Sequence, residues 1–147
     1  MKYQKEIIVK SLDELKSFAE VFLNFLENNT NSTQIVGLSG DLGAGKTTFS
    51  KEIAKLLGVE ETVTSPTFGI QKQYMTKNKA FREFVHIDVY RIEDIREIGA
   101  LRFVELFEKP NTLIFIEWPE KIAEVLPKET IMLSFEAIDE NTRKISY

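Results

Sequence analysis

The sequence of 147 residues contains no cysteine and only one histidine, His86. The lack of cysteine excludes disulfide bonds, thiolate catalysis and a cysteine-based zinc site. A single histidine is too few for a histidine metal cluster. Cysteine chemistry and histidine-rich metal sites therefore drop out of the functions to be considered.

The sequence also has little that would hold a membrane or a nucleic acid. No apolar run approaches the roughly 20 residues of a membrane span, and the stretch MKYQKEIIVK lacks the apolar core of a signal peptide. Lys and Arg number 19 against 23 Asp and Glu, a formal net charge of -4, whereas direct binding of nucleic acid needs a basic surface. We expect a cytoplasmic protein that does not hold nucleic acid by itself, although a local basic patch is compatible with this composition.

What is present suits one globular domain. Hydrophobic residues make up 43% and charged residues 29% of the chain, which is the ordinary globular range. There is no internal repeat, low-complexity tract or interdomain linker. We predict one domain over residues 1–147.

The strongest motif is GDLGAGKTTF at residues 40–49, which matches the phosphate-binding pattern G-x-x-x-x-G-K-[ST]. The apolar run 34–40 before it predicts a strand, and the helical spacing of 46–57, ended by Gly58, predicts a helix. Small residues allow the backbone to wrap around phosphates and present its N–H groups, with the helix N-terminus adding its dipole. In this pattern Lys46 reaches the β- and γ-phosphates and the Thr47 hydroxyl ligates Mg²⁺, with Thr48 as a further phosphate contact. The alternative is a glycine turn before a helix with an ordinary lysine.

The remaining chain alternates between strand and helix patterns. A helix is predicted at 11–27, where Ser11 and Glu14 have capping-box spacing. Further predicted elements are strands at 67–75 and 81–90 forming a hairpin or neighbouring pair, one or two helices at 92–108, a central strand at 112–118, a short helix at 119–126, and strands at 130–137 and 142–147. This order predicts an α/β fold of three layers, with a central mixed sheet flanked by helices.

Two acidic residues directly follow apolar strand patterns. A nucleotide hydrolase needs a carboxylate at the end of a strand near the phosphate loop, because Mg²⁺ prefers oxygen ligands and the attacking water must be oriented. Asp88 follows FVHI and Glu117 follows LIFI. We favour Glu117 for Mg²⁺, directly or through water, and Asp88 for orienting water or supporting the metal. For either residue the alternative is a solvated charge or a local cap.

For other residues the sequence supports a functional role less strongly. The segment TVTSPTF lies where many phosphate-loop proteins sense the γ-phosphate, although a Ser-Pro turn is equally compatible with it. His86 is more typical of a packed or hydrogen-bonded core residue than of a base. Trp118 suits packing, a cover over the nucleotide or a partner contact, and no feature decides among these. Arg91 suits an ion pair with Glu93 or Asp94 better than an arginine finger.

Taken together, GDLGAGKTTF, then SPTF, HIDVYR and IEWPE resemble the bacterial TsaE family. The resemblance covers nearly the whole chain in order and spacing. The family is the ATPase component of tRNA threonylcarbamoyladenosine biosynthesis, so the resemblance implies a P-loop NTPase-like fold, with ATP and Mg²⁺ as ligands. It also implies the protein partners TsaB and TsaD. Within that pathway the threonylcarbamoyl group goes onto adenosine 37 of tRNAs that read codons beginning with A, and the transfer itself belongs to TsaD.

The resemblance also implies roles for individual residues. Lys46, Asp88 and Glu117 would be catalytic, with Asp88 assisting hydrolysis, and Thr47 and Glu117 would hold Mg²⁺. The expected nucleotide-binding residues are Asp41, Leu42, Gly43, Ala44, Gly45, Lys46, Thr47 and Thr48, and the expected nucleotide-responsive residues are Ser65, Pro66 and Thr67. ATP turnover would regulate or reset the partners, which hold the tRNA.

Two other functions compete with this one. A small-molecule kinase would use the same phosphate loop, but such enzymes generally need an arginine-bearing lid to exclude water, and no Arg-rich insertion stands out. A binding module with a structural nucleotide would need no hydrolysis.

Overall fold

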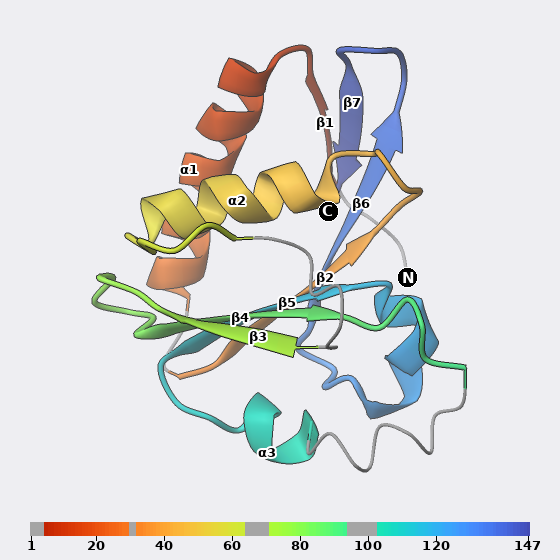
Figure 1. Cartoon of the computed structure of the whole chain (residues 1–147). Helices are drawn as coiled ribbons and strands as arrows, with labels where there is room; N and C mark the ends of the chain where they lie inside the picture. Colours follow the sequence, from red (N-terminus) through yellow and green to blue (C-terminus); the bar gives the residue numbers. More distant parts are fainter. Residues whose placement is uncertain (1–4, 30–31, 64–70, 94–102) are drawn as a thin grey trace.

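The computed structural model describes residues 5–29, 32–63, 71–93 and 103–147. Within these ranges the strands form one mixed sheet in the order β1-β7-β6-β2-β5-β4-β3 (Figure 1). The strands are β1 (Glu6–Val9), β2 (Gln34–Ser39), β3 (Gln71–Met75), β4 (Glu83–Asp88), β5 (Thr112–Glu117), β6 (Ile131–Ala137) and β7 (Arg143–Ser146). The helices are α1 (Leu12–Asn28), α2 (Lys46–Leu56), α3 (Phe103–Phe107) and the 3₁₀ segment η2 (Pro119–Val125).

The interior of the sheet is parallel and its edges are antiparallel. Strand β2 pairs in parallel with both β6 and β5, and β5 pairs in parallel with β4. Antiparallel pairing adds β7 and β1 at one edge and β3 at the other. All six residues of β5 are buried, as expected for an interior parallel strand that is covered on both faces. The mixed sheet and the interior position predicted for this strand are confirmed.

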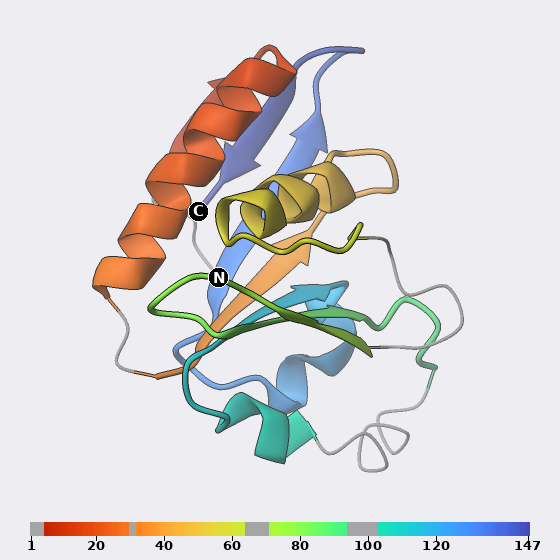
Figure 2. The ribbon, with the colours of Figure 1, turned by 60° about the vertical axis from the view of Figure 1, so that its left-hand side comes forward.

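Helices cover both faces of the sheet. Figures 1 and 2 show α1 and α2 on one face and α3 and η2 on the other. Successive side chains of β5 alternate between these layers: Phe115 packs in the core with α1 and α2, whereas Ile114 and Ile116 pack with α3 and η2. This arrangement is the predicted three-layer α/β fold.

An aromatic cluster holds α2 in place directly behind the phosphate loop. Phe49, in the first turns of α2, is fully buried. Its ring centroid lies 5.6 Å from that of Phe18 and 5.9 Å from that of Phe22 on α1. The centroids of Phe115 on β5 and Phe135 on β6 lie 5.9 and 5.4 Å away. The helix that begins at the phosphate loop is therefore fixed to both α1 and the sheet.

The N-terminal helix begins where the capping pattern predicted. The Ser11 hydroxyl accepts a hydrogen bond from the Glu14 N–H at 3.1 Å. The Glu14 carboxylate in turn accepts from the N–H of Lys10 at 3.2 Å, one residue before the cap. These contacts satisfy N–H groups that an open helix end would leave without partners.

Three segments differ from the sequence prediction or extend it. The short helix predicted at 119–126 is a 3₁₀ segment, interrupted at Ile122, whose φ of -125° is not helical. Strand β1, which no sequence pattern predicted, adds an antiparallel edge next to β7. Of the one or two helices predicted at 92–108, the structure describes α3 at the end of that range, and residues 94–102 lie outside the described ranges.

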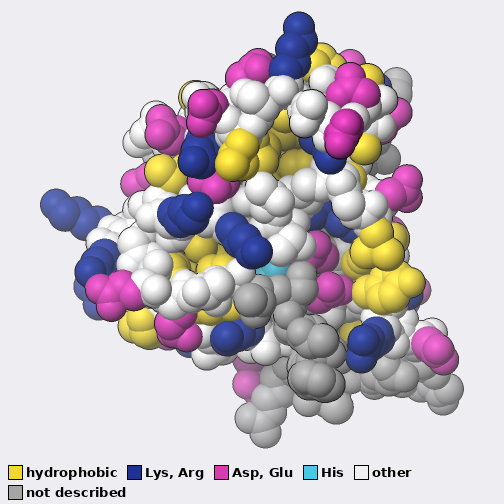
Figure 3. All heavy atoms as spheres, turned by 45° about the horizontal axis from the view of Figure 1, so that its top comes forward, with side chains coloured by type: hydrophobic (Ala, Val, Ile, Leu, Met, Phe, Trp, Pro, Cys, Tyr) yellow, Lys and Arg dark blue, Asp and Glu magenta, His cyan; other side chains and the backbone are white. Residues whose placement is uncertain are grey.

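The surface carries charges of both signs. Figure 3 shows basic and acidic side chains intermixed over one face. None of the helices in the described ranges is long and apolar enough to cross a membrane.

Candidate functional site

The candidate site lies at the edge of the sheet where the parallel strands β2, β5 and β4 end. The register places Leu38 of β2 and Asp88 of β4 on either side of Glu117, the last residue of β5. Open α/β sheets bind ligands at this edge, outside the carboxyl ends of their strands. The phosphate loop follows β2 at the same edge, so the predicted loop and both predicted carboxylates meet there.

The phosphate loop depends on glycines at its two ends. Gly40 has φ +138°, and a Cβ atom on it would lie 2.3 Å from the backbone oxygen of Phe135 on β6. Gly45 has φ +106° and caps α2 without a side chain that could bond to the first helical N–H groups. Those groups are left available to an anion, and the helix dipole favours negative charge at this position.

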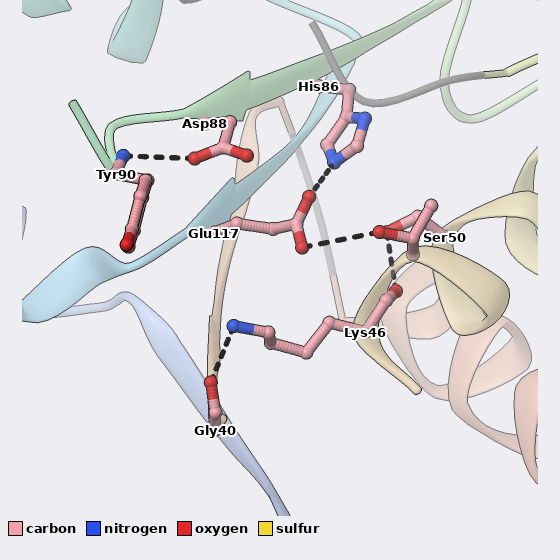
Figure 4. Close-up of polar contacts among 8 residues, drawn as sticks. Gly40, Lys46, Ser50, His86, Asp88, Tyr90 and Glu117 are labelled. Carbon is pink, nitrogen blue, oxygen red and sulfur yellow. Dashed lines mark hydrogen bonds and ion pairs between the residues drawn. The ribbon is translucent and has the colours of Figure 1, made fainter. Parts of the chain in front are cut away.

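Lys46 is buried at the start of α2, with 4% of its surface exposed. Its Nζ donates a hydrogen bond to the Gly40 carbonyl oxygen at 2.5 Å (Figure 4). It also lies 4.1 Å from the centroid of the Trp118 ring. Burial lowers the pKa of the ammonium group, while nearby carboxylates, Glu117 foremost, act in the opposite direction. The lysine thus forms a charge-assisted hydrogen bond inside the loop that a phosphate oxygen could replace.

Glu117 is also buried, and its two carboxylate oxygens have different partners. Oε2 lies 2.8 Å from Nε2 of His86, which is fully buried. Oε1 accepts a hydrogen bond of 3.5 Å from the hydroxyl of Thr47. The carboxylate therefore spans from β4 to the first turn of α2.

Asp88 lies beside Glu117 in the sheet but has different surroundings. Its Oδ1 accepts a hydrogen bond of 2.9 Å from the backbone N–H of Tyr90. Partial burial raises the pKa of Asp88. The Tyr90 hydrogen bond opposes this shift, and the charge of Glu117 adds to it. Asp88 is consequently a weaker acid, and so a stronger base, than a solvated aspartate.

The structure brings the predicted catalytic residues Lys46, Asp88 and Glu117 to one edge, together with Thr47. Asp41, Leu42, Gly43 and Thr48 are exposed, Gly45 is half-buried and Ala44 is buried. The loop therefore offers mainly its backbone to a ligand. The predicted nucleotide-responsive residues Ser65, Pro66 and Thr67 lie outside the described residues.

Two residues near the site take contacts that the sequence patterns did not indicate. Trp118 adopts a left-handed backbone conformation, φ +63°, and its ring lies 5.2 Å from that of Tyr90 as well as against Lys46. Arg143, at the start of β7, donates from Nη2 to the Gly43 carbonyl oxygen at 3.4 Å and from Nη1 to that of Asp139 at 2.7 Å. No motif could reveal the contact between Arg143 and Gly43, because these residues are a hundred positions apart in the chain.

The oxygen atoms of Thr47 and Glu117 suit a hard divalent cation. Mg²⁺ is usually bound by one or two protein oxygens, with water and substrate phosphates completing its coordination. Across the described ranges, no group of three or more His, Cys, Asp and Glu side chains could hold a metal ion alone. The donor set thus fits a Mg²⁺ ion shared with a nucleotide rather than one caged by protein.

The chain matches known proteins over most of its length. Residues 9–145 match the family model of the threonylcarbamoyl adenosine biosynthesis protein TsaE. The tRNA threonylcarbamoyladenosine biosynthesis protein TsaE of Rickettsia felis is 38% identical, covering 95% of this chain and 77% of that protein. The protein of the same name from Bacillus subtilis is 36% identical, covering 92% of this chain and 79% of the relative.

A solved structure agrees with these sequence matches. The crystal structure of Bacillus subtilis YdiB superposes with a TM-score of 0.72 at 28% identity, covering 99% of this chain and 85% of that one. The family suggested by the four sequence motifs is confirmed. The chain belongs to the TsaE family of threonylcarbamoyl adenosine biosynthesis proteins.

Proposed function

We propose that the protein is the ATP-hydrolysing component of the complex that places the threonylcarbamoyl group on adenosine 37 of tRNAs reading codons that begin with A. The observation that carries this proposal is the meeting of Lys46, Thr47, Asp88 and Glu117 at the carboxyl edge of the sheet. A glycine turn with an ordinary lysine would not require two strand-end carboxylates to face it.

Nucleotide binding rests on the backbone of the phosphate loop and on Lys46. The uncapped N–H groups at the start of α2 bind the phosphates, and the loop glycines allow the close approach. The Lys46 ammonium exchanges the Gly40 carbonyl for a phosphate oxygen. The bond to Gly40 is already charge-assisted, so the net gain comes from replacing a neutral carbonyl acceptor by an anionic phosphate oxygen.

Thr47 and Glu117 are the residues that would hold Mg²⁺, which neutralises charge on the β- and γ-phosphates when bound. Asp88 orients the attacking water. Its raised pKa suits that task, since a weaker acid accepts a hydrogen bond and a proton more readily. Glu117, with both oxygens already directed to partners, is less free to act on water.

The transfer of the threonylcarbamoyl group is assigned to TsaD, and the partners TsaB and TsaD hold the tRNA. A net charge of -4 gives this chain little basis for binding RNA alone. ATP binding and hydrolysis act on the partners through the segment that contains Ser65, Pro66 and Thr67, and hydrolysis resets the complex between turnovers. If analogues that cannot be hydrolysed supported many turnovers as well as ATP does, this coupling would be wrong.

The deciding experiment is phosphate release from ATP by the purified protein, alone and with TsaB and TsaD. We expect slow release alone, faster release with the partners, and loss of activity in Lys46→Ala. Lys51→Ala is the matched control, because Lys51 is an exposed lysine in the same helix. Fast release that ignores the partners would contradict the proposal. ADP formation without matching free phosphate would indicate a kinase, and nucleotide binding that survives without any turnover would indicate a binding module.

A further inference from the structure

We propose that His86 is a positioning residue that fixes the Glu117 carboxylate so that one of its oxygens faces Thr47. This inference rests on the proposed function, because it concerns the site assigned above to Mg²⁺. It adds a residue that sequence patterns favoured only as a packed or hydrogen-bonded part of the core.

The strand register places His86 and Glu117 on the same face of the sheet. Phe84 and Phe115 belong to the core beneath α1 and α2, and His86 and Glu117 each lie two residues further along the same strands. Residues two apart in a strand point to the same face. In the parallel pairing His86 is opposite Phe115, one pair before Glu117. Both side chains therefore lie in the layer that contains α2 and the phosphate loop.

His86 is held firmly enough to orient a neighbour. Its side chain is fully buried and its ring stacks against that of Phe84, with an interplanar angle of 13° and centroids 6.5 Å apart. Nε2 has the Glu117 carboxylate as its partner, whereas Nδ1 has no hydrogen-bond partner among the residues that the structure describes. To donate a hydrogen bond to an ionised carboxylate, a neutral imidazole must carry its proton on Nε2.

The hydrogen bond at 2.8 Å determines which way the carboxylate faces. It engages Oε2, so Oε1 is directed at the Thr47 hydroxyl, 3.5 Å away. A buried carboxylate without this donor would lose much of its compensation for leaving water, and it could rotate away from Thr47. Outer-shell partners of this kind orient metal ligands, and their loss typically costs about 10- to 100-fold in metal affinity.

Two variants separate positioning from packing. His86→Phe keeps a ring of similar size beside Phe84 but removes the donor. His86→Gln keeps an amide N–H that can reach Glu117 but removes the ring. If His86 acts only through packing, Phe is the better replacement; if it acts through the hydrogen bond, Gln is.

The first measurement is ADP binding at varied Mg²⁺ concentration and in EDTA. Binding is monitored through the fluorescence emission of Trp118, the only tryptophan in the sequence. For His86→Phe we expect about a 10-fold or larger rise in the Mg²⁺ concentration at half effect. Affinity in EDTA should change less than twofold, and His86→Gln should recover most of the Mg²⁺ response. Unchanged Mg²⁺ dependence in His86→Phe, or equal loss of ADP affinity with and without Mg²⁺, would overturn the proposal.

A second measurement does not require any substituted protein to retain its metal response. His86 is the only histidine, so the imidazole nitrogens of untagged, ¹⁵N-labelled protein give the signals of one residue. We expect the tautomer protonated at Nε2, and a changed Nε2 signal in Glu117→Gln. Protonation at Nδ1 instead, or no response to Glu117→Gln, refutes the contact even if His86→Phe fails to fold. Failure of the wild type to bind ADP at all, with the Nε2 tautomer intact, would instead count against the proposed function.

Discussion

The most direct test of the loop geometry is Gly40→Ala. The added Cβ atom would lie 2.3 Å from the Phe135 backbone oxygen, far inside the 3.0 Å that Cβ contacts essentially never breach. Neither partner is a flexible side-chain end, so the loop and β6 must separate by most of an ångström. The φ of +138° adds strain of about 1–3 kcal/mol for a residue with a side chain.

Gly43→Ala supplies the matched control within the same loop. Gly43 also has positive φ, +81°, but a Cβ atom there meets no heavy atom within 4 Å. It therefore incurs the left-handed strain alone, about 1–2 kcal/mol. At about 2–4 °C of melting temperature per kcal/mol for a chain near this size, we expect Gly43→Ala to lose a few degrees. Gly40→Ala should lose at least twice as much.

Urea and thermal unfolding without nucleotide measure this difference, so that contacts between the new methyl group and phosphate do not enter. ADP binding is then measured on the folded variants. A displacement near 1 Å can cost about 100-fold in function, so Gly40→Ala should also bind ADP poorly. Equal free energies of unfolding for the two variants would refute the close contact between the loop and β6.

Three further predictions concern charges around the site. Because the pKa of Asp88 is raised in the folded protein, Asp88 contributes stability that is present below the ordinary aspartate pKa of about 4 and is lost as pH rises through the folded value. Relative to the wild type, the free energy of unfolding of Asp88→Asn, measured in urea, should therefore increase as the pH is raised from 4. A difference in unfolding free energy that does not change with pH would contradict the pKa shift. Glu117→Gln should bind ADP more tightly than the wild type in EDTA, because the Glu117 carboxylate of the wild type repels phosphate, but less tightly in Mg²⁺. Titration calorimetry checks this reversal, and the same order of affinities in both buffers would contradict it. Arg143→Ala should weaken ADP binding several-fold by releasing Gly43, whereas the neighbouring Lys144→Ala, whose partner is Glu136, should not; equal effects would count against the Arg143 contact.

The parts of the fold that local chemistry determines were predictable from the sequence. The capping pair Ser11 and Glu14 located the start of α1, and the phosphate-loop pattern located the turn between β2 and α2. In both cases the interacting groups lie within a few residues of one another, so their spacing is visible in the chain. The continuous apolar run of β5 likewise indicated an interior strand.

What depends on distant partners was not predictable. Strand β1 is only four residues long, and its pairing partner β7 is about 140 positions away in the chain. The segment after Trp118 has helical spacing but forms 3₁₀ turns interrupted at Ile122, whose side chain is buried in the core shared with β5 and α3. Spacing could suggest Asp88 and Glu117 separately, whereas the contact between His86 and Glu117 emerges only from the sheet register.

The register also explains how two adjacent carboxylates come to differ. Asp88 and Glu117 are direct partners in parallel strands and share a face, so their positions in the sheet do not distinguish them. Glu117 is bonded to an imidazole and a hydroxyl, and this fixes both its oxygens. Asp88 has one backbone N–H, partial burial and a negative neighbour, which together hold its pKa above the usual value. Two carboxylates in different environments can take different roles in one reaction. Within the proposed hydrolysis, this difference is what assigns the metal to Glu117 and the water to Asp88.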